Sequence, residues 1–136
     1  GMDITFCSFN KTSKILTIQL ANHSPIMFNN GKLSIIEGDV FSIGGNVGIG
    51  KSVYTSHQIK IVADTTLYMF SDGYQDQFGG TKNQKYMTPR FIEFLENIQD
   101  KPFSEHKMLI QNEYNRWKGD SKQIDDVLVI GVKFLA

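Results

Sequence analysis

Residues 64–80, DTTLYMFSDGYQDQFGG, are the stretch that decides the fold. The run TTLYMF is apolar on both faces, which is typical of a central strand covered on two sides. It stops at Ser71-Asp72-Gly73, a triplet of turn-forming residues. Asp72 is therefore expected at the carboxyl end of a buried strand, where sheets expose functional groups.

The chain before this stretch has the pattern of a β-rich half. The runs 3–9 and 14–21 are extended and are separated by NKTS, which predicts a hairpin. PIMF (25–28) and KLSII (32–36) flank NNG, a strong tight-turn signal because Asn and Gly tolerate positive φ. Residues 57–63, HQIKIVA, alternate as a half-buried strand does.

The chain after residue 88 changes to the period of a helix. Thr88 and Ser104 are each interpreted as an N-cap, and Gly119 stands where a helix C-terminus favours glycine. Two helices are predicted between about Pro89 and Lys118, followed by a central strand in DVLVIGVKF, 126–134. The predicted class is α+β, with a mostly antiparallel two-sheet core flanked by helices.

Length and composition describe one ordinary globular domain of 136 residues. Fourteen basic and fourteen acidic side chains cancel, so nothing in the net charge favours nucleic acid or an anionic membrane. Cys7, the only cysteine, excludes an internal disulfide and is expected to be a buried, inert thiol. No run has the length of a membrane span, so a cytoplasmic protein without direct membrane contact is expected.

Residues 45–52, GNVGIGKS, match the phosphate-binding pattern G-x-x-x-x-G-K-[ST]. That loop needs a helix after it, so that the positive helix N-terminus faces the phosphate. Here the following residues alternate and include β-branched side chains, which predicts a strand. The match is therefore interpreted as an accident in a glycine-rich surface loop, with no nucleotide bound at Gly45–Ser52.

Asp125 and Asp126 stand directly before the last predicted strand, as Asp72 stands directly after an earlier one. If these two strands are antiparallel neighbours, Asp72 and Asp125 converge at one edge. Paired carboxylates repel unless a proton or a cation lies between them, and hard divalent cations prefer such ligands. The alternative is that Asp-Gly forms a turn and Asp-Asp is simply solvated.

Four stretches together resemble the later part of the bacterial metal-dependent protein phosphatase domain, in its stage II sporulation protein E-like serine phosphatase branch. They are LANHSPIMFNNGKL, GDVFSIGG, DTTLYMFSDGYQDQFGG and WKGDSKQIDDVLVIGV. The resemblance implies a phosphatase-type antiparallel β-sandwich and hydrolysis of phosphoserine or phosphothreonine on a regulatory phosphoprotein. It implies two Mn²⁺ or Mg²⁺ ions, with Asp72 and Asp125 as ligands, and Gly73 and Asp126 beside them. Asp76 follows Asp72 closely and is either a partner of metal-bound water or a solvent-exposed residue. Such an ion pair activates water and neutralises the phosphoryl group.

The sequence also departs from that family. The early motif with the carboxylate that bridges the two metals has no counterpart in residues 1–60, and Asn22 stands where the branch usually has Gly. Residues 1–136 are therefore expected to be the C-terminal portion of such a domain, with Gly1 a cloning remnant. This piece is expected to bind one ion or none, to be inactive alone and to form a homodimer. The alternative function is a non-catalytic signalling or interaction module on a degenerate phosphatase scaffold.

Overall fold

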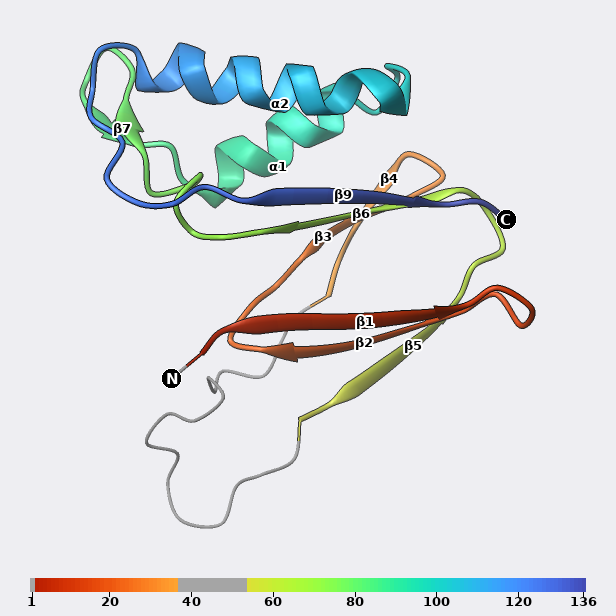
Figure 1. Ribbon diagram of the computed structural model, residues 1–136. Helices are drawn as coiled ribbons and strands as arrows, with labels where there is room; N and C mark the ends of the chain where they lie inside the picture. Colours follow the sequence, from red (N-terminus) through yellow and green to blue (C-terminus); the bar gives the residue numbers. More distant parts are fainter. Residues whose placement is uncertain (1, 37–53) are drawn as a thin grey trace, which may run out of the picture.

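The computed structural model describes residues 2–36 and 54–136, so the GNVGIGKS string at 45–52 lies outside the described residues. The described chain forms an α+β fold in three layers (Figure 1). Its elements, in chain order, are β1 (Ile4–Asn10), β2 (Ile15–Ala21), β3 (Ile26–Asn29), β4 (Lys32–Ile35), β5 (Ser56–Lys60), β6 (Thr65–Phe70), β7 (Phe78–Gly79), β8 (Gln84–Lys85), α1 (Thr88–Asn97), α2 (Phe103–Lys118) and β9 (Val129–Phe134).

Two antiparallel sheets lie face to face, and both helices cover the outer face of one of them (Figure 1). The first sheet has the order β1-β2-β5 and the second the order β4-β3-β6-β9. The two predicted hairpins are present as β1–β2 and β3–β4. Asn30 and Gly31 take positive φ in the second turn, as the NNG signal requires. The predicted two-sheet antiparallel core is confirmed.

Alternation in the strands builds the layer between the two sheets. Leu16, Ile18 and Leu20 point inward from β2 because residues two apart share a face of a strand. They meet Leu67 of β6 and Phe134 of β9, which are also buried. Cys7 packs against the same cluster but is only half-buried, not buried as predicted; burial raises the pKa of its thiol, so the group is protonated at neutral pH.

A second hydrophobic layer lies between the sheet β4-β3-β6-β9 and the helices. It is rich in aromatic rings that meet edge-on or tilted, which adds to the stability gained from their buried area. The buried members are Ile26, Phe28, Tyr68, Phe70, Tyr74, Tyr86, Phe91, Leu95, Ile98, Ile110, Tyr114 and Trp117. Most of the buried aromatic residues thus belong to this layer.

The helix ends differ slightly from the prediction. Thr88 is the first residue of α1 rather than its cap; Met87 precedes it with a φ of 73°. Helix α2 begins at Phe103, one residue before the predicted cap Ser104. Pro102 fixes an extended backbone just before the helix, so the helix begins at the next residue, earlier in the chain than predicted. Gly119 ends α2 with a φ of 52°, as predicted. Neither helix is long and apolar enough to cross a membrane, among the residues described.

The final strand β9 is not central. Among the described residues it pairs only with β6 and forms one edge of its sheet. Its apolar pattern therefore leaves two exposed side chains near this edge, Leu128 at 57% and Ile130 at 44% of their full accessible area. The predicted central position in the sheet was wrong, whereas the predicted antiparallel pairing with β6 was right.

Candidate metal centre

Asp72 lies where β6 ends and a tight loop begins. Thr65 to Phe70 pair antiparallel with β9, and the amide of Ser71 continues this ladder by donating to Leu128 O at 2.9 Å. The chain then turns, and the amide of Asp76 donates to the carbonyl oxygen of Asp72 at 2.9 Å. This turn leaves the Asp72 side chain exposed at the end of a buried strand, as the sequence predicted.

Ser71 and Gly73, on either side of Asp72, both contact the backbone of Asp126. The Ser71 hydroxyl donates to Asp126 O at 3.1 Å and accepts from the amide of Leu128 at 2.9 Å. A Cβ atom at Gly73 would overlap the carbonyl oxygen of Asp126, so only glycine permits this approach. The Ser-Asp-Gly triplet is thus held directly against the Asp125-Asp126 pair.

Asp125 is exposed one residue before this contact. Its carboxylate accepts the amide of Asp126 at 2.8 Å, which fixes the local turn. The side chain of Gln123 supports the same turn by donating to Asp125 O at 2.9 Å. The loops of Asp72 and Asp125 therefore lie against each other at one end of the β6–β9 pair. Asp126 contributes to this arrangement through its backbone.

Asp76 lies in the same loop but faces a different partner. Its carboxylate lies 3.5 Å from the ammonium group of Lys85 on β8. Both side chains remain partly exposed, so this ion pair contributes little to stability. The structure gives Asp76 this structural contact, and its role beside a metal ion stays a prediction.

A polar cavity of about 390 Å³ opens beside Asp72. Asp3, His23 and Gln75 are among the other residues that line it. The side-chain oxygen of Gln75 is buried and has no hydrogen-bond partner among the described residues. An acceptor without a donor, next to a carboxylate, suits a hard cation or its water. The donors present therefore fit one Mn²⁺ or Mg²⁺ ion at Asp72.

A complete two-ion centre needs more carboxylates than these loops supply. Across residues 2–36 and 54–136, no three His, Cys, Asp or Glu side chains are grouped so that they could hold a metal ion. Asp72 and Asp125 are the two predicted ligands; Asp72 lines the polar cavity, and Asp125 is not among the residues that line it. The described residues thus fit part of the centre that the resemblance implies.

Gln77 fixes the segment that leads to Asp125, a role that the sequence did not indicate. Its side chain is fully buried, accepts from the hydroxyl of Tyr114 at 2.7 Å, and donates to Lys122 O at 2.8 Å. Its backbone oxygen accepts from the indole of Trp117 at 2.9 Å. One amide therefore connects the Asp72 loop, helix α2 and the chain between α2 and Asp125.

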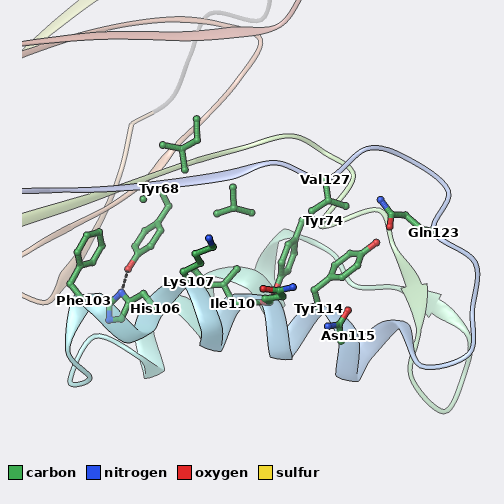
Figure 2. Close-up of a pocket in the computed structure, with 14 residues that line it drawn as sticks. Tyr68, Tyr74, Phe103, His106, Lys107, Ile110, Tyr114, Asn115, Gln123 and Val127 are labelled. Atoms are coloured by element: carbon green, nitrogen blue, oxygen red, sulfur yellow. Dashed lines mark hydrogen bonds between the residues drawn. The ribbon is translucent and has the colours of Figure 1, made fainter.

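A wider groove of about 710 Å³ lies between α2 and β9, and neither Asp72 nor Asp125 is among its lining residues (Figure 2). Its lining contains no Asp or Glu. His106 lies in it, but one ring nitrogen bonds to the hydroxyl of Tyr68 at 2.6 Å and the other to Lys101 O at 3.1 Å. Burial raises the pKa of Tyr68, so its hydroxyl stays protonated and structural. The groove offers no free catalytic group among these side chains.

Comparison with known proteins identifies the family and the fold of this chain. The family model of stage II sporulation protein E (SpoIIE) matches residues 2–135. The SiaA-PP2C domain of Pseudomonas aeruginosa superposes with a TM-score of 0.77 and 20% identity, over 90% of this chain and 47% of that one. A search of curated protein sequences gives no match.

Two structures of the phosphatase domain of SpoIIE from Bacillus subtilis also superpose, each with a TM-score of 0.70 over 98% of this chain. The first is 10% identical and is covered over 59% of its length. The second, described as Mn presoaked, is 11% identical and is covered over 56%. The chain thus spans about half the length of the solved phosphatase domains that it matches. On its sequence and its fold together, the chain belongs to the SpoIIE family.

Proposed function

We propose that the protein to which this chain belongs is a metal-dependent serine/threonine phosphatase that acts on a phosphorylated regulatory protein. The observation that carries the proposal is the contact of Ser71 and Gly73 with Asp126. It holds two exposed aspartates at one edge of the sandwich in a chain of the SpoIIE family. Such an edge is open to a bulky phosphoprotein, as an enclosed cavity would not be.

In this proposal Asp72 and Asp125 hold Mn²⁺ or Mg²⁺, which when bound activates water and neutralises the phosphoryl oxygens. The other residues of the two loops keep these carboxylates in place. Ser71 and Gly73 fix the first loop on the second, and Gln77 fixes the approach to Asp125. Gln75, whose side-chain oxygen has no hydrogen-bond partner among the described residues, lines the same cavity as Asp72.

The residues of this chain support one weakly held ion rather than two. Two of the carboxylates expected of a complete centre are present, and an ion pair needs a further carboxylate that bridges both ions. We therefore propose that the chain as it stands binds Mn²⁺ weakly at one site and turns over no phosphoserine substrate.

The second candidate is a non-catalytic signalling module that kept the scaffold and lost the metal centre. The observation that favours it is that the Asp125 carboxylate is already bonded to the amide of Asp126. The two candidates differ in the natural gene, because an Asp before a Gly-His-Gly-like stretch upstream of Met2 is expected only for the enzyme.

The test combines metal binding with turnover. Mn²⁺ is titrated into ¹⁵N-labelled protein, and paramagnetic broadening of the amides of residues 71–76 and 123–127 is measured. Asp72→Asn, which keeps the shape of the side chain, is the matched variant. We expect broadening confined to these two loops, an affinity at least about tenfold weaker in Asp72→Asn, and no hydrolysis of p-nitrophenyl phosphate at millimolar Mn²⁺.

Two outcomes contradict the proposal in different ways. Broadening that Asp72→Asn does not change would show that Asp72 holds no ion. Robust Mn²⁺-dependent turnover that Asp72→Asn abolishes would show that the chain is catalytically self-sufficient, so the one-ion argument would be wrong.

A further inference from the structure

His23 lies in the connection between β2 and β3, and its imidazole bridges the two sheets. One ring nitrogen, Nδ1, lies 2.5 Å from the hydroxyl of Thr5 on β1. The other, Nε2, lies 2.6 Å from the carbonyl oxygen of Phe70, the last residue of β6. The ring also meets the Phe70 ring edge-on, with 5.3 Å between the ring centroids. A single side chain thus joins the first sheet to the strand that carries Asp72.

The partners fix how the protons are placed. A carbonyl oxygen only accepts, so Nε2 carries a proton and donates it to Phe70 O. Nδ1 is then free to accept from the hydroxyl of Thr5. Both nitrogens are engaged with the protein itself. His23 therefore has no free nitrogen for a metal ion or a substrate proton, which excludes the role of a ligand or a general base in this arrangement.

The bond to Phe70 O replaces a missing ladder bond. Strand β3 pairs with β6 only from Thr65 to Tyr68, so Phe70 extends beyond its end. On the other side β9 continues to pair, and Ser71 N still bonds to Leu128 O at 2.9 Å. The last residue of β6 would thus be held on one side only. The His23 N–H supplies the donor that a longer β3 would have given.

The backbone conformation of Asn22, the residue before His23, helps to place the His23 side chain. Asn22 takes a φ of 48°, a left-handed conformation that Asn and Gly adopt more readily than other residues. This accounts for Asn at the position where the resembling phosphatases carry Gly. The Asn22 side chain adds a bond to the carboxylate of Asp3 at 3.2 Å, which ties the turn to the start of β1.

We propose that His23 is a positioning residue that fixes the end of β6 and so the place of Asp72. Asp72 lies two residues beyond the carbonyl that His23 holds, and both residues line the same polar cavity. The part of this proposal that concerns metal affinity rests on the proposed function. The part that concerns the order of the Asp72 loop does not.

The first measurement is metal-free amide hydrogen exchange, followed by NMR. The reporters are the amides of Ser71 and Asp76, bonded to Leu128 O and Asp72 O; the reference is the amide of Asn30, bonded to Asp64 O. We expect His23→Ala to accelerate exchange at both reporters by about tenfold and to leave Asn30 within about twofold, because one lost hydrogen bond acts locally. His23→Gln, which again offers a donor and an acceptor, is expected to restore most of the protection.

A matched pair tests the second bond of His23. Thr5→Val keeps the shape of the side chain and removes the hydroxyl, whereas Thr5→Ser keeps the hydroxyl. We expect Thr5→Val to accelerate exchange at Ser71 about three- to tenfold and Thr5→Ser to leave it near the wild-type rate. Tyr68→Phe is the control for general destabilisation, since it removes the bond to His106 on the helix side of β6.

Uniform acceleration in His23→Ala, or equal acceleration of Ser71 in Tyr68→Phe, would overturn the proposal. The second measurement is the Mn²⁺ titration with the same variants, where we expect about a three- to tenfold weaker affinity in His23→Ala and recovery in His23→Gln. If Asp72→Asn weakens Mn²⁺ binding and His23→Ala does not, the positioning role toward the metal fails while the proposed function stands. If Asp72→Asn has no effect, the proposed function fails, and exchange alone decides the role of His23.

Discussion

Each residue of the triplet Ser71-Asp72-Gly73 has a distinct structural role. Ser71 uses its hydroxyl as both donor and acceptor toward the strand that follows Asp126. Gly73 leaves room for the carbonyl of Asp126, and Asp72 is exposed between them. The short motif therefore encodes the contact between two loops as well as a candidate ligand.

A methyl group at Gly73 is expected to separate the two loops. Gly73→Ala places a Cβ on the carbonyl oxygen of Asp126, so the backbone must shift, at a cost of about 1–3 kcal/mol. Urea unfolding followed by tryptophan fluorescence measures this cost. Asp72→Asn is the control one residue away; because its side chain is exposed, its free energy of unfolding should change by less than about 0.5 kcal/mol. Equal stability of the two variants would contradict the close contact at Gly73.

The sequence predicts some residues of the site and misses others for a physical reason. Asp72 and Asp125 follow from strand ends and from the resemblance, because each stands beside a recognisable apolar run. The two hydrogen-bond partners of His23 do not, since they lie 18 and 47 positions away, and no local pattern records such contacts. Gln77 is missed because a polar residue in a loop gives no sign that it is fully buried.

At the scale of the elements, strands and hairpins follow closely from alternation and turn residues, and helix ends follow less closely. Alternation reports burial on one face, and together with short apolar runs and turn residues it locates β1 to β6 well. It cannot tell whether a strand apolar on both faces has neighbours on both sides. Strand β6 has a neighbouring strand on each side, whereas β9 has only one neighbouring strand among the described residues. Sheet order depends on the whole topology.

Gln77 offers a test of how the loops, helix α2 and the chain before Asp125 are held together. Gln77→Met keeps the length of the side chain but removes its bonds to Tyr114 and to Lys122 O, which leaves buried polar groups unpaired. We expect a loss of about 2–4 kcal/mol in the free energy of unfolding, measured with urea. Tyr114→Phe, which removes only the first bond, should cost about 1 kcal/mol. A smaller loss in Gln77→Met than in Tyr114→Phe would rule out this connecting role.

At the scale of the whole molecule, β1 and β9 are edge strands of the two main sheets among the described residues, and β5 and β4 are the opposite edges. Phe6 on β1 is 57% exposed, as is Leu128 just before β9, and Ile130 on β9 is 44% exposed. Unpaired strand edges with apolar side chains favour pairing with another chain. We expect a homodimer in solution, measured by size-exclusion chromatography with light scattering.

A charge on this edge should prevent the association. Ile130→Lys places an ammonium group on the open edge of β9, a change that natural edge strands use against pairing. We expect this variant to elute as a monomer, whereas Lys133→Arg on the same strand keeps the charge and should remain dimeric. A wild-type chain that is monomeric at high concentration would remove the dimer and leave the fold and the candidate metal centre unaffected.

The contact between Ser71 and Asp126 also sets when the centre can exist during synthesis. Fifty-five positions separate these two residues, so a ribosome releases Asp72 well before its partner loop. Until β9 docks on β6, Asp72 is a lone carboxylate on an unpaired strand end, and a lone carboxylate holds a divalent ion poorly. Closing so long a loop is slow and comes late in folding. On the proposed function, cation uptake is deferred until the final strand has been translated, and we expect a half-made chain to collect no manganese.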